Sequence, residues 1–173
     1  MENFKFIDRP DSERIKATAE EYHEIDENLV LNFLNFQWTY REMQKQYDAL
    51  LSQFNLTESR FIILMFLKRS PENMLLPSDI SLKLGASRPT VSKLLKAMEQ
   101  IDLVEKITSS SDKRSAYFKI TNKGNETLKA FMPHNFEAVK TIFSQLDLKD
   151  LENLKHLLKA INQGTLKLQK EME

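Results

Sequence analysis

The sequence predicts a mainly α-helical fold with a minor β component. In this fold a helix-turn-helix and a β-hairpin lie between long N- and C-terminal helices. The 173 residues include only three Gly and five Pro, a composition that favours long helices. Apolar residues recur at helical spacing over residues 29–54 and 128–161. Two short runs of strand-forming residues follow residue 102, with a polar segment between them.

The N-terminal third is predicted to be a helical arm. Pro10, Asp11 and Ser12 are typical of a helix start. Further along, apolar residues alternate steps of four and three, which is the heptad pattern of helices that pack against other helices. The seam consists of Leu29, Phe33, Phe36, Tyr40, Met43, Tyr47, Leu50 and Phe54. So long a stripe needs a partner, either the C-terminal half of this chain or a second chain.

A second helix is predicted to start at Thr57, a capping residue. Residues 61–67 are apolar on every face, a pattern that also fits a buried strand. The two basic residues that follow are typical of a helix C-terminus, so we interpret the segment as a buried helix. Residues 75–76 offer a further short strand beside the hairpin.

The helix-turn-helix is predicted over residues 77–100. Ile80 and Leu84 lie four apart and so share one helical face. Gly85 follows at the point where a helix ends with a positive φ, and Ser87 can cap the next helix. The buried stripe of this second helix consists of Val91, Leu94, Leu95 and Met98. Two short helices joined by a three-residue turn that contains Gly are typical of this motif.

The opposite face of the second helix carries hydroxyl and cationic groups and no acidic residue. Its members are Ser87, Arg88, Pro89, Thr90, Ser92, Lys93 and Lys96. Short hydroxyls and long cations near a helix N-terminus suit the major groove of DNA, where they can contact phosphates and base edges. A solvated face on an ordinary helical hairpin explains the same residues, so this pattern alone leaves both interpretations open.

A β-hairpin is predicted from residues 103–108 and 115–120, with the polar loop 109–114 between the strands. The adjacent cations Lys113 and Arg114 at its tip can reach across a phosphate backbone into the minor groove. Asp112 lies beside them, where its carboxylate can orient Arg114. A solvated turn is the alternative.

Two C-terminal helices are predicted after the hairpin. Thr121 caps the first, whose apolar face continues to residue 146, and Asp147 caps the second. Gly164 and the charged tail are expected to end the chain's last helix. Burying one large apolar side chain is worth roughly 1.5–3 kcal/mol, so the seams at both ends of the chain need cover. A homodimer supplies it; an intramolecular bundle is the alternative.

The net charge of the chain is zero, but its distribution is uneven. Residues 85–123 hold eight Lys or Arg against four Asp or Glu, a net of +4, whereas residues 1–58 hold six against twelve, a net of −6. The local field steers an encounter with DNA, so a neutral chain is compatible with DNA binding.

Several classes of function are disfavoured. No apolar run approaches the roughly 20 residues that a membrane span needs. The chain has no Cys, which excludes disulfides and thiolate metal sites, and its three His are scattered without a metal-ligand spacing. No phosphate-binding loop or catalytic constellation is present, so we expect no enzyme, no cofactor and no metal, and a cytoplasmic location.

Four segments in one order resemble the MarR family of bacterial transcriptional regulators. They are 56–64 (LTESRFIIL), 84–95 (LGASRPTVSKLL), 112–115 (DKRS) and 120–124 (ITNKG). The resemblance runs from about residue 29 to residue 161. It implies a dimeric winged helix-turn-helix protein that binds a palindromic operator, with residues 87–96 as the recognition helix. It also implies that Asp112 and Arg114 match the family's wing-tip Asp-x-Arg.

Two positions depart from the family pattern. Asp102 stands where the family usually has Gly, and a serine run occupies residues 109–111, where Pro or a charged residue is common. Asp tolerates a left-handed conformation better than most residues but less well than Gly. Neither change conflicts with the fold, and both bear on the geometry of the wing.

We therefore expect three parts in the chain. Residues 1–54 would form an N-terminal extension and dimerisation helix, 55–123 the winged helix-turn-helix DNA-binding unit, and 124–173 the C-terminal dimerisation helices. The expected function is that of a sequence-specific regulator of transcription, a repressor, which binds double-stranded DNA as a homodimer. The alternative is a winged-helix module that binds another protein and no operator.

The resemblance also implies a ligand site between the dimerisation helices and the DNA-binding unit. The first helices offer aromatic and polar groups for it, namely Tyr22, His23, Trp38, Tyr40 and Arg41. Amphipathic aromatic residues suit a flat, weakly acidic molecule, so a small aromatic or phenolic effector is expected. Packing in a helix interface is the alternative explanation.

Overall fold

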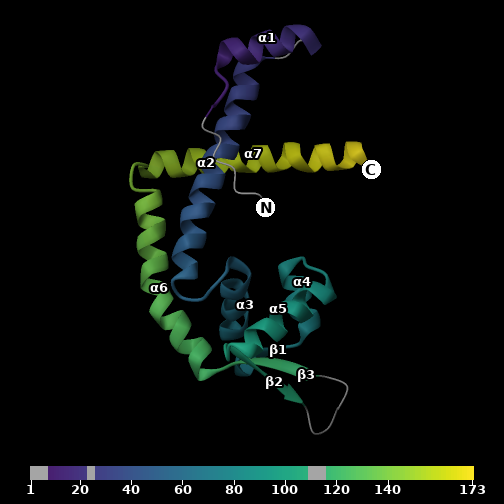
Figure 1. Ribbon diagram of the computed structural model, residues 1–173, viewed down its shortest axis with the longest axis vertical. Helices are drawn as coiled ribbons and strands as arrows, with labels where there is room; N and C mark the ends of the chain where they lie inside the picture. The colour runs from purple at the N-terminus through teal and green to yellow at the C-terminus, as the bar shows by residue number, and fades with distance from the viewer. Residues whose placement is uncertain (1–7, 23–25, 109–115) are drawn as a thin grey trace. The chain divides into compact units, whose positions relative to one another are not determined.

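The computed structural model describes residues 8–22, 26–108 and 116–173 (Figure 1). The chain divides into two compact units, residues 1–58 and 59–173. The first consists of two helices, α1 (Ser12–Tyr22) and α2 (Glu27–Ser52), where Asp26 caps α2 by accepting a hydrogen bond from the Asn28 N–H. The mainly α-helical fold that the sequence predicts is confirmed.

The helix α2 ends earlier than the heptad seam indicates. Its last residue is Ser52, so Phe54, the last member of the seam, lies in the turn that follows. Asn55 has a φ of 55° in this turn, and the Leu56 N–H donates to the carbonyl of Leu51. Asn enters the left-handed region more readily than most residues, which allows this turn to form directly after α2.

The second unit begins with α3 (Glu58–Arg69), followed by the short helix η1 (Pro71–Asn73) and the strand β1 (Met74–Leu75). The interpretation of the apolar segment 61–67 as a helix is confirmed. The additional short strand is also present, one residue earlier than expected, and it pairs antiparallel with β3, where Leu75 faces Phe118.

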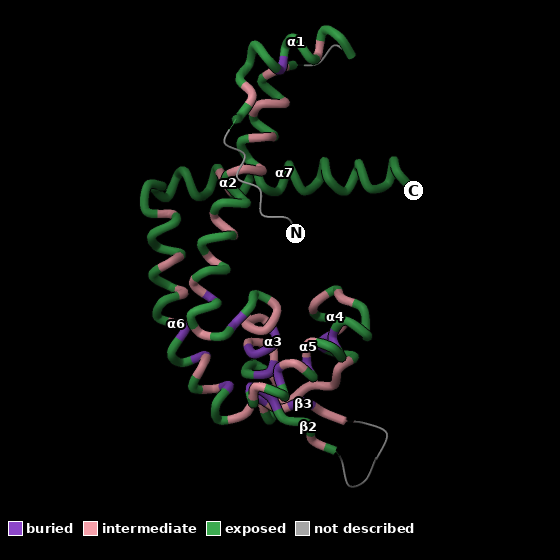
Figure 2. Tube along the Cα trace, viewed as in Figure 1, coloured by how far each residue is buried: buried purple, intermediate pink, exposed green. Residues whose placement is uncertain are grey.

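The helix-turn-helix consists of α4 (Pro77–Leu84) and α5 (Arg88–Gln100), and the hairpin consists of β2 (Val104–Thr108) and β3 (Ala116–Ile120). The three strands form one antiparallel sheet in the order β1-β3-β2. The buried side chains of this unit come from α3, α4, α5, the turn after α5, the two long strands and the first half of α6 (Figure 2). The winged helix-turn-helix fold is therefore confirmed.

The last two helices are α6 (Asn122–Ile142) and α7 (Leu148–Met172). Asp147 caps α7 in a reciprocal pair with Asp150, each side chain accepting from the other residue's backbone N–H. The expectation that Gly164 ends this helix is wrong, because α7 continues to Met172. A Gly in a helix interior costs only about 1 kcal/mol, and the strong cap and apolar periodicity outweigh it.

No residue of α7 is buried, and Figure 2 shows this helix exposed along most of its length. Its large apolar side chains are accessible to solvent, for example Leu157 at 62% and Leu168 at 55%. The seam of α2 is similar, with Leu29 at 63% and Phe33 at 58%. Each of the two long helices thus presents an apolar face that its own unit leaves accessible.

Candidate nucleic-acid interface

The turn between α4 and α5 is fixed by backbone conformation and by two hydrogen bonds. Gly85 has a φ of 62° and ψ of 28°, the left-handed conformation that ends α4. The Ala86 N–H donates to the carbonyl of Ser81 at 3.1 Å, and the Ser81 hydroxyl donates to the carbonyl of Ala86 at 2.5 Å. This closed turn holds α5 at a fixed angle to α4.

Ser87 caps α5, as the sequence predicts. Its backbone is extended, and its hydroxyl oxygen accepts a hydrogen bond from the Thr90 N–H at 3.3 Å. The hydroxyls of Ser87 and Thr90 also lie 2.8 Å apart, so the two groups share one hydrogen bond. Pro89 occupies the first turn, where an α-helix has no use for its missing N–H.

One face of α5 anchors the helix and the other faces solvent. Val91, Leu95 and Met98 are fully buried in the core of the unit. The seven residues at and near the start of α5 that are predicted to contact DNA lie on the exposed side, namely Ser87, Arg88, Pro89, Thr90, Ser92, Lys93 and Lys96. The structure therefore brings these seven residues together on one accessible surface, which we call the α5 face.

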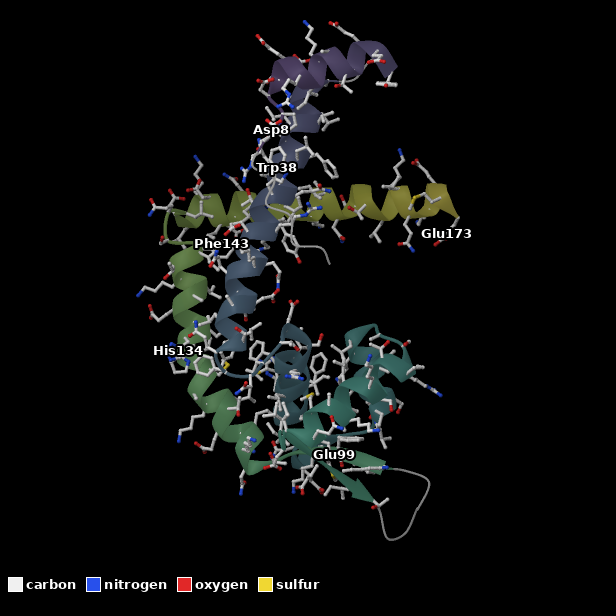
Figure 3. The ribbon with its side chains drawn as sticks, viewed as in Figure 1. Asp8, Trp38, Glu99, His134, Phe143 and Glu173 are labelled. Atoms are coloured by element: carbon white, nitrogen blue, oxygen red, sulfur yellow. The ribbon has the colours of Figure 1, made fainter. Side chains whose placement is uncertain are left out.

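The α5 face is electropositive. Arg88, Lys93 and Lys96 have no carboxylate within ion-pair distance among the residues that the structure describes. The first turn of α5 holds no acidic residue, and its helix dipole adds partial positive charge there. The carboxylate of Glu99 lies near the other end of the helix (Figure 3). Anions are therefore attracted to the N-terminal half of α5.

The hairpin forms the expected wing base beside α5. Its strands pair in antiparallel register from Val104 opposite Ile120 to Thr108 opposite Ala116. Glu105 faces Lys119 across the ladder, an opposite-charge pair that favours this register. The wing-tip predictions for Asp112, Lys113 and Arg114 lie outside the described residues.

Asp102 adopts the conformation that its place in the sequence requires. Its φ is 60°, in the left-handed region, at the turn between α5 and β2. The Asp102 N–H donates to the carbonyl of Glu99 and the Leu103 N–H to that of Met98, at 3.0 and 2.9 Å. The turn is therefore made as a Gly would make it, although a non-Gly residue is strained there.

The structure describes four of the five residues predicted to hold an effector, namely Tyr22, Trp38, Tyr40 and Arg41. Trp38 is partly buried, and the guanidinium of Arg9 lies 4.9 Å from the centre of its ring, a cation–π contact. Tyr40 is 52% exposed and Tyr22 76% exposed. His23 lies outside the described residues. The assignment of these side chains and of Arg41 to a ligand site stays a prediction.

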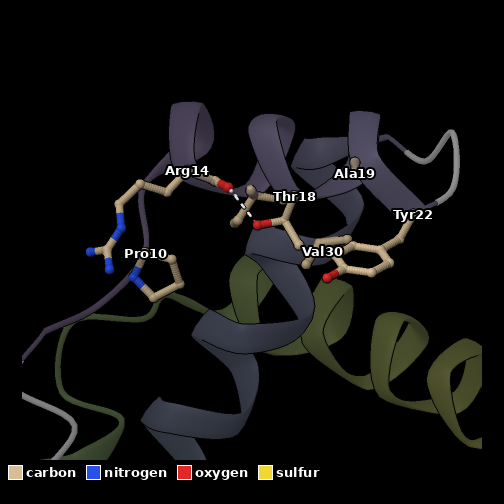
Figure 4. Close-up of a pocket in the computed structure, with 7 residues that line it drawn as sticks. Pro10, Arg14, Thr18, Ala19, Tyr22 and Val30 are labelled. Carbon is tan, nitrogen blue, oxygen red and sulfur yellow. Dashed lines mark hydrogen bonds between the residues drawn. The ribbon is translucent and has the colours of Figure 1, made fainter.

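A hollow of about 410 Å³ lies between α1 and the start of α2 (Figure 4). It is lined by Pro10, Arg14, Ile15, Thr18, Ala19, Tyr22 and Val30. Among the described residues, Tyr22 is the one predicted ligand residue in its lining.

Arg14 supplies the cation of this hollow, and it is already paired. It donates two hydrogen bonds to the carboxylate of Asp8, at 2.7 and 3.0 Å. These hydrogen bonds and the guanidinium charge hold the pKa of Asp8 below its usual range. The Thr18 hydroxyl donates to the carbonyl of Arg14 and keeps its oxygen as an acceptor.

Other kinds of site are not found in the described part of the chain. Residues 8–22, 26–108 and 116–173 contain no group of three or more His, Asp or Glu side chains placed to hold a metal ion. Within the same ranges, no helix has both the length and the apolar character that crossing a membrane requires.

Comparison with known proteins identifies the family to which this fold belongs. The model of the MarR family matches residues 54–115, which include α3, the helix-turn-helix and β2. The transcriptional regulator MgrA of Staphylococcus aureus is 30% identical over 136 residues, which cover 76% of this chain and 88% of MgrA. The chain belongs to the MarR family.

Solved structures of MarR proteins share its fold. AbsC, a MarR family transcriptional regulator from Streptomyces coelicolor, superposes with a TM-score of 0.72 at 25% identity and covers 84% of this chain and 99% of AbsC. MepR of Staphylococcus aureus, solved as a complex with DNA, has a TM-score of 0.65 at 27% identity. That match covers 76% of this chain and 96% of MepR.

Sequence reasoning missed two features of this MarR protein. Arg14 and Thr18 of the hollow gave no signal, because a four-residue spacing on one helix is common. Thr121 was interpreted as a cap alone, yet its hydroxyl also donates to the carbonyl of Asp102 at 2.6 Å. The partner is 19 residues away in sequence, so only the folded chain reveals the contact.

Proposed function

We propose that this MarR protein is a sequence-specific repressor that binds double-stranded DNA as a homodimer on a palindromic operator. The observation that carries the proposal is the α5 face, in which three cations and three hydroxyls project from a helix anchored by fully buried Val91, Leu95 and Met98. Such a surface can contact phosphates and base edges together. The solved complex of the relative MepR with DNA supports it. A bacterial repressor works beside the chromosome, so we also propose a cytoplasmic location.

The proposed homodimer is supported by the uncovered apolar faces of α2 and α7. Large side chains such as Phe33 and Leu157 are more than half exposed in the single chain. Burying each is worth roughly 1.5–3 kcal/mol, and a twofold dimer covers the same patch on both copies at once. The symmetry also supplies two α5 helices for two half-sites about one helical turn of DNA apart.

The decisive experiment selects bound sequences from random duplexes with the purified protein. The expected result is an inverted repeat whose half-site centres lie about 10 base pairs, or a multiple of that, apart. Affinity for the selected duplex should then fall steeply as salt is raised, because cations that contact phosphates release counterions. A protein-binding module would enrich no sequence, and that outcome would refute the proposal.

Variants of the α5 face test the assignment of its residues. Arg88→Ala and Lys93→Ala should each weaken binding to the selected duplex by about 1–3 kcal/mol if they contact base edges, and relax the preference at those bases. Lys140→Ala is the matched control, because it removes the same charge from an exposed position on the last turn of α6. Equal losses in all three variants would show that only overall charge matters.

Assembly is tested by light scattering and sedimentation. Phe33→Asp introduces a charge into the α2 seam and should convert the dimer to a monomer at micromolar concentration. The matched control is Leu82→Asp on α4, because Leu82 is 84% exposed and lies outside the proposed interface. Dissociation of both variants, or of neither, would contradict this choice of interface.

We also propose that a small aromatic carboxylate regulates DNA binding from the hollow between α1 and α2. The volume of about 410 Å³ lies within the usual range for ligand pockets, and the lining combines apolar walls with a guanidinium and two hydroxyls. A ligand carboxylate would take the place of Asp8 on Arg14, and its ring would lie among Ile15, Val30 and Tyr22.

Calorimetric titration with benzoate and hydroxybenzoates tests the effector site. Arg14→Met keeps the aliphatic part of the side chain and should abolish the binding of these carboxylates. Arg9→Met is the matched control, since Arg9 stacks on Trp38 and does not line the hollow. Binding that survives in Arg14→Met, or is lost in both variants, would place the effector elsewhere.

A further inference from the structure

Thr121 joins the end of the recognition helix region to the start of α6. Its hydroxyl accepts a hydrogen bond from the Gly124 N–H at 3.0 Å and donates to the carbonyl of Asp102 at 2.6 Å. Its own backbone N–H donates to the carbonyl of Leu103 at 3.2 Å. One residue thus makes hydrogen bonds to the first turn of α6 and to the turn after α5.

The first turn of α6 and the turn after α5 are also in direct van der Waals contact. A Cβ atom built on Gly124 would lie 2.3 Å from the carbonyl oxygen of Leu103 and 2.8 Å from Cγ1 of Ile120. Gly124 is buried, so the first turn of α6 rests on the backbone of residue 103. The contact leaves α6 no room to slide against this turn.

Hydrogen bonds in turn connect residues 102–103 to α5 and so to the core. The hydrogen bonds from Asp102 to Glu99 and from Leu103 to Met98 close the end of α5, and Met98 is fully buried. A displacement of residues 102–103 is therefore transmitted to the whole recognition helix.

Hydrogen bonds of Asn125 also connect α3 to the first turn of α6. The side-chain amide of Asn125 donates to the carbonyl of Thr121 at 2.9 Å, and its oxygen accepts from the ammonium of Lys68 at 2.8 Å. The first turn of α6 is thus tied to α3 and to the exit of α5 together. We call the contacts made by Thr121, Gly124 and Asn125 the α6 joint.

We propose that Thr121 is a positioning residue that fixes the angle between α6 and the recognition helix. In the proposed dimer, α6 belongs to the part of the chain that pairs with the second copy. The spacing of the two recognition helices is then set by the orientation of α6, transmitted through the α6 joint. This inference rests on the proposed function, and its central test uses no DNA.

The distinction from an ordinary helix cap is chemical. A cap needs only an acceptor for the Gly124 N–H, whereas the joint also needs a donor toward the carbonyl of Asp102. Thr121→Ser keeps both functions. Thr121→Asp keeps the acceptor and has no donor when ionised. Thr121→Val keeps the shape and has neither.

The test measures the distance between spin labels on α4 and at the end of α6. The chain has no Cys, so Ser78→Cys with Lys140→Cys gives one label at each of two exposed sites. Labelled protein is mixed with an excess of unlabelled protein, so that pairs within one chain dominate the pulsed dipolar signal. The parent and Thr121→Ser should give one narrow distribution, and Thr121→Asp and Thr121→Val should give a broader or shifted one.

Thr127→Val is the matched control. Thr127 also lies on α6, and its hydroxyl donates to the carbonyl of Lys123 within the same helix, away from the joint. Its loss should leave the distribution narrow. Narrow, unshifted distributions in Thr121→Asp and Thr121→Val would overturn the proposal, because the hydroxyl would then serve only as a cap.

A second measurement compares the selected duplex with one that carries an extra base pair between the half-sites. The insertion separates the half-sites by about 3.4 Å more, and the wild type should discriminate against it. The ratio of the two affinities should fall about two- to tenfold in Thr121→Val, the factor that corresponds to one lost hydrogen bond, and stay unchanged in Thr127→Val. An unchanged ratio in Thr121→Val would overturn the proposal. If the wild type bound no duplex, the proposed function would fail, and the label distances would still decide the role of Thr121.

Discussion

Replacing Gly124 with Ala should destabilise the protein, contrary to the usual effect of Ala in a helix. Ala is favoured over Gly by about 1 kcal/mol within helices. At position 124, however, the new methyl group would lie 2.3 Å from a backbone oxygen that cannot rotate away. Overpacking of this kind costs about 1–3 kcal/mol, and a clash with backbone belongs at the upper end. The expected net loss is about 2 kcal/mol.

Urea unfolding followed by circular dichroism measures this loss. With a slope of about 2 kcal/mol per molar urea, the midpoint of Gly124→Ala should fall by about 1 M. Gly164→Ala is the matched control, because its Cβ would meet nothing within 4 Å in α7 and should raise stability by up to about 1 kcal/mol. Both are measured at one protein concentration, since the proposed dimer would gain stability with concentration. A midpoint for Gly124→Ala at or above that of the wild type would refute the close contact at Leu103.

Three further substitutions test the helix-turn-helix by the same unfolding measurement. Ser87→Ala removes the cap of α5 and should cost about 1 kcal/mol; no change would show that the 3.3 Å hydrogen bond contributes nothing. Leu95→Ala empties a fully buried position and should cost about 2–5 kcal/mol, so a loss well under 1 kcal/mol would contradict its burial. Asp102→Gly removes the strain of a non-Gly residue at a φ of 60° and should stabilise the protein by up to about 1 kcal/mol. A less stable variant would show that Asp102 is not strained.

The helices and the wing base were predictable because local signals agree with one another in this chain. Gly85 and Ser87 lie where a turn and a cap are needed, and the apolar stripe of α5 begins directly after them. The apolar periodicity of segment 61–67 fits a strand as well as a helix, and the basic residues that follow it correctly indicated a helix. Elements whose ends carry chemical signals were therefore predicted well.

The ends of α2 and α7 were predicted less well, because apolar spacing does not mark where a helix stops. The heptad pattern includes Phe54, although α2 ends at Ser52 and Asn55 follows with a φ of 55°. Gly164 resembles a terminator, but it keeps a helical φ inside α7. A single Gly is too weak a signal to end a helix with a strong cap.

The candidate sites differ in how well they can be predicted from the sequence. The exposed set of α5 follows from helical geometry once the buried stripe is known, so its seven members were all found. The hollow near Arg14 depends on how α1 folds back on α2, which no local pattern specifies. The α6 joint depends on a hydroxyl and a carbonyl that are 19 residues apart. Long-range contacts of this kind have no signature in one sequence.

The solvent exposure of α7 has a consequence for the amount of this protein in the cell. A helix with no buried residue in its own unit is expected to open more readily than the buried core and to be cleaved earlier by a protease. Pairing with a second copy would protect it, so unpaired molecules would be degraded faster than paired ones. The amount of working regulator would then vary more steeply than the rate of its synthesis. Proteolysis would in this way remove surplus single copies and sharpen the response of the genes it controls.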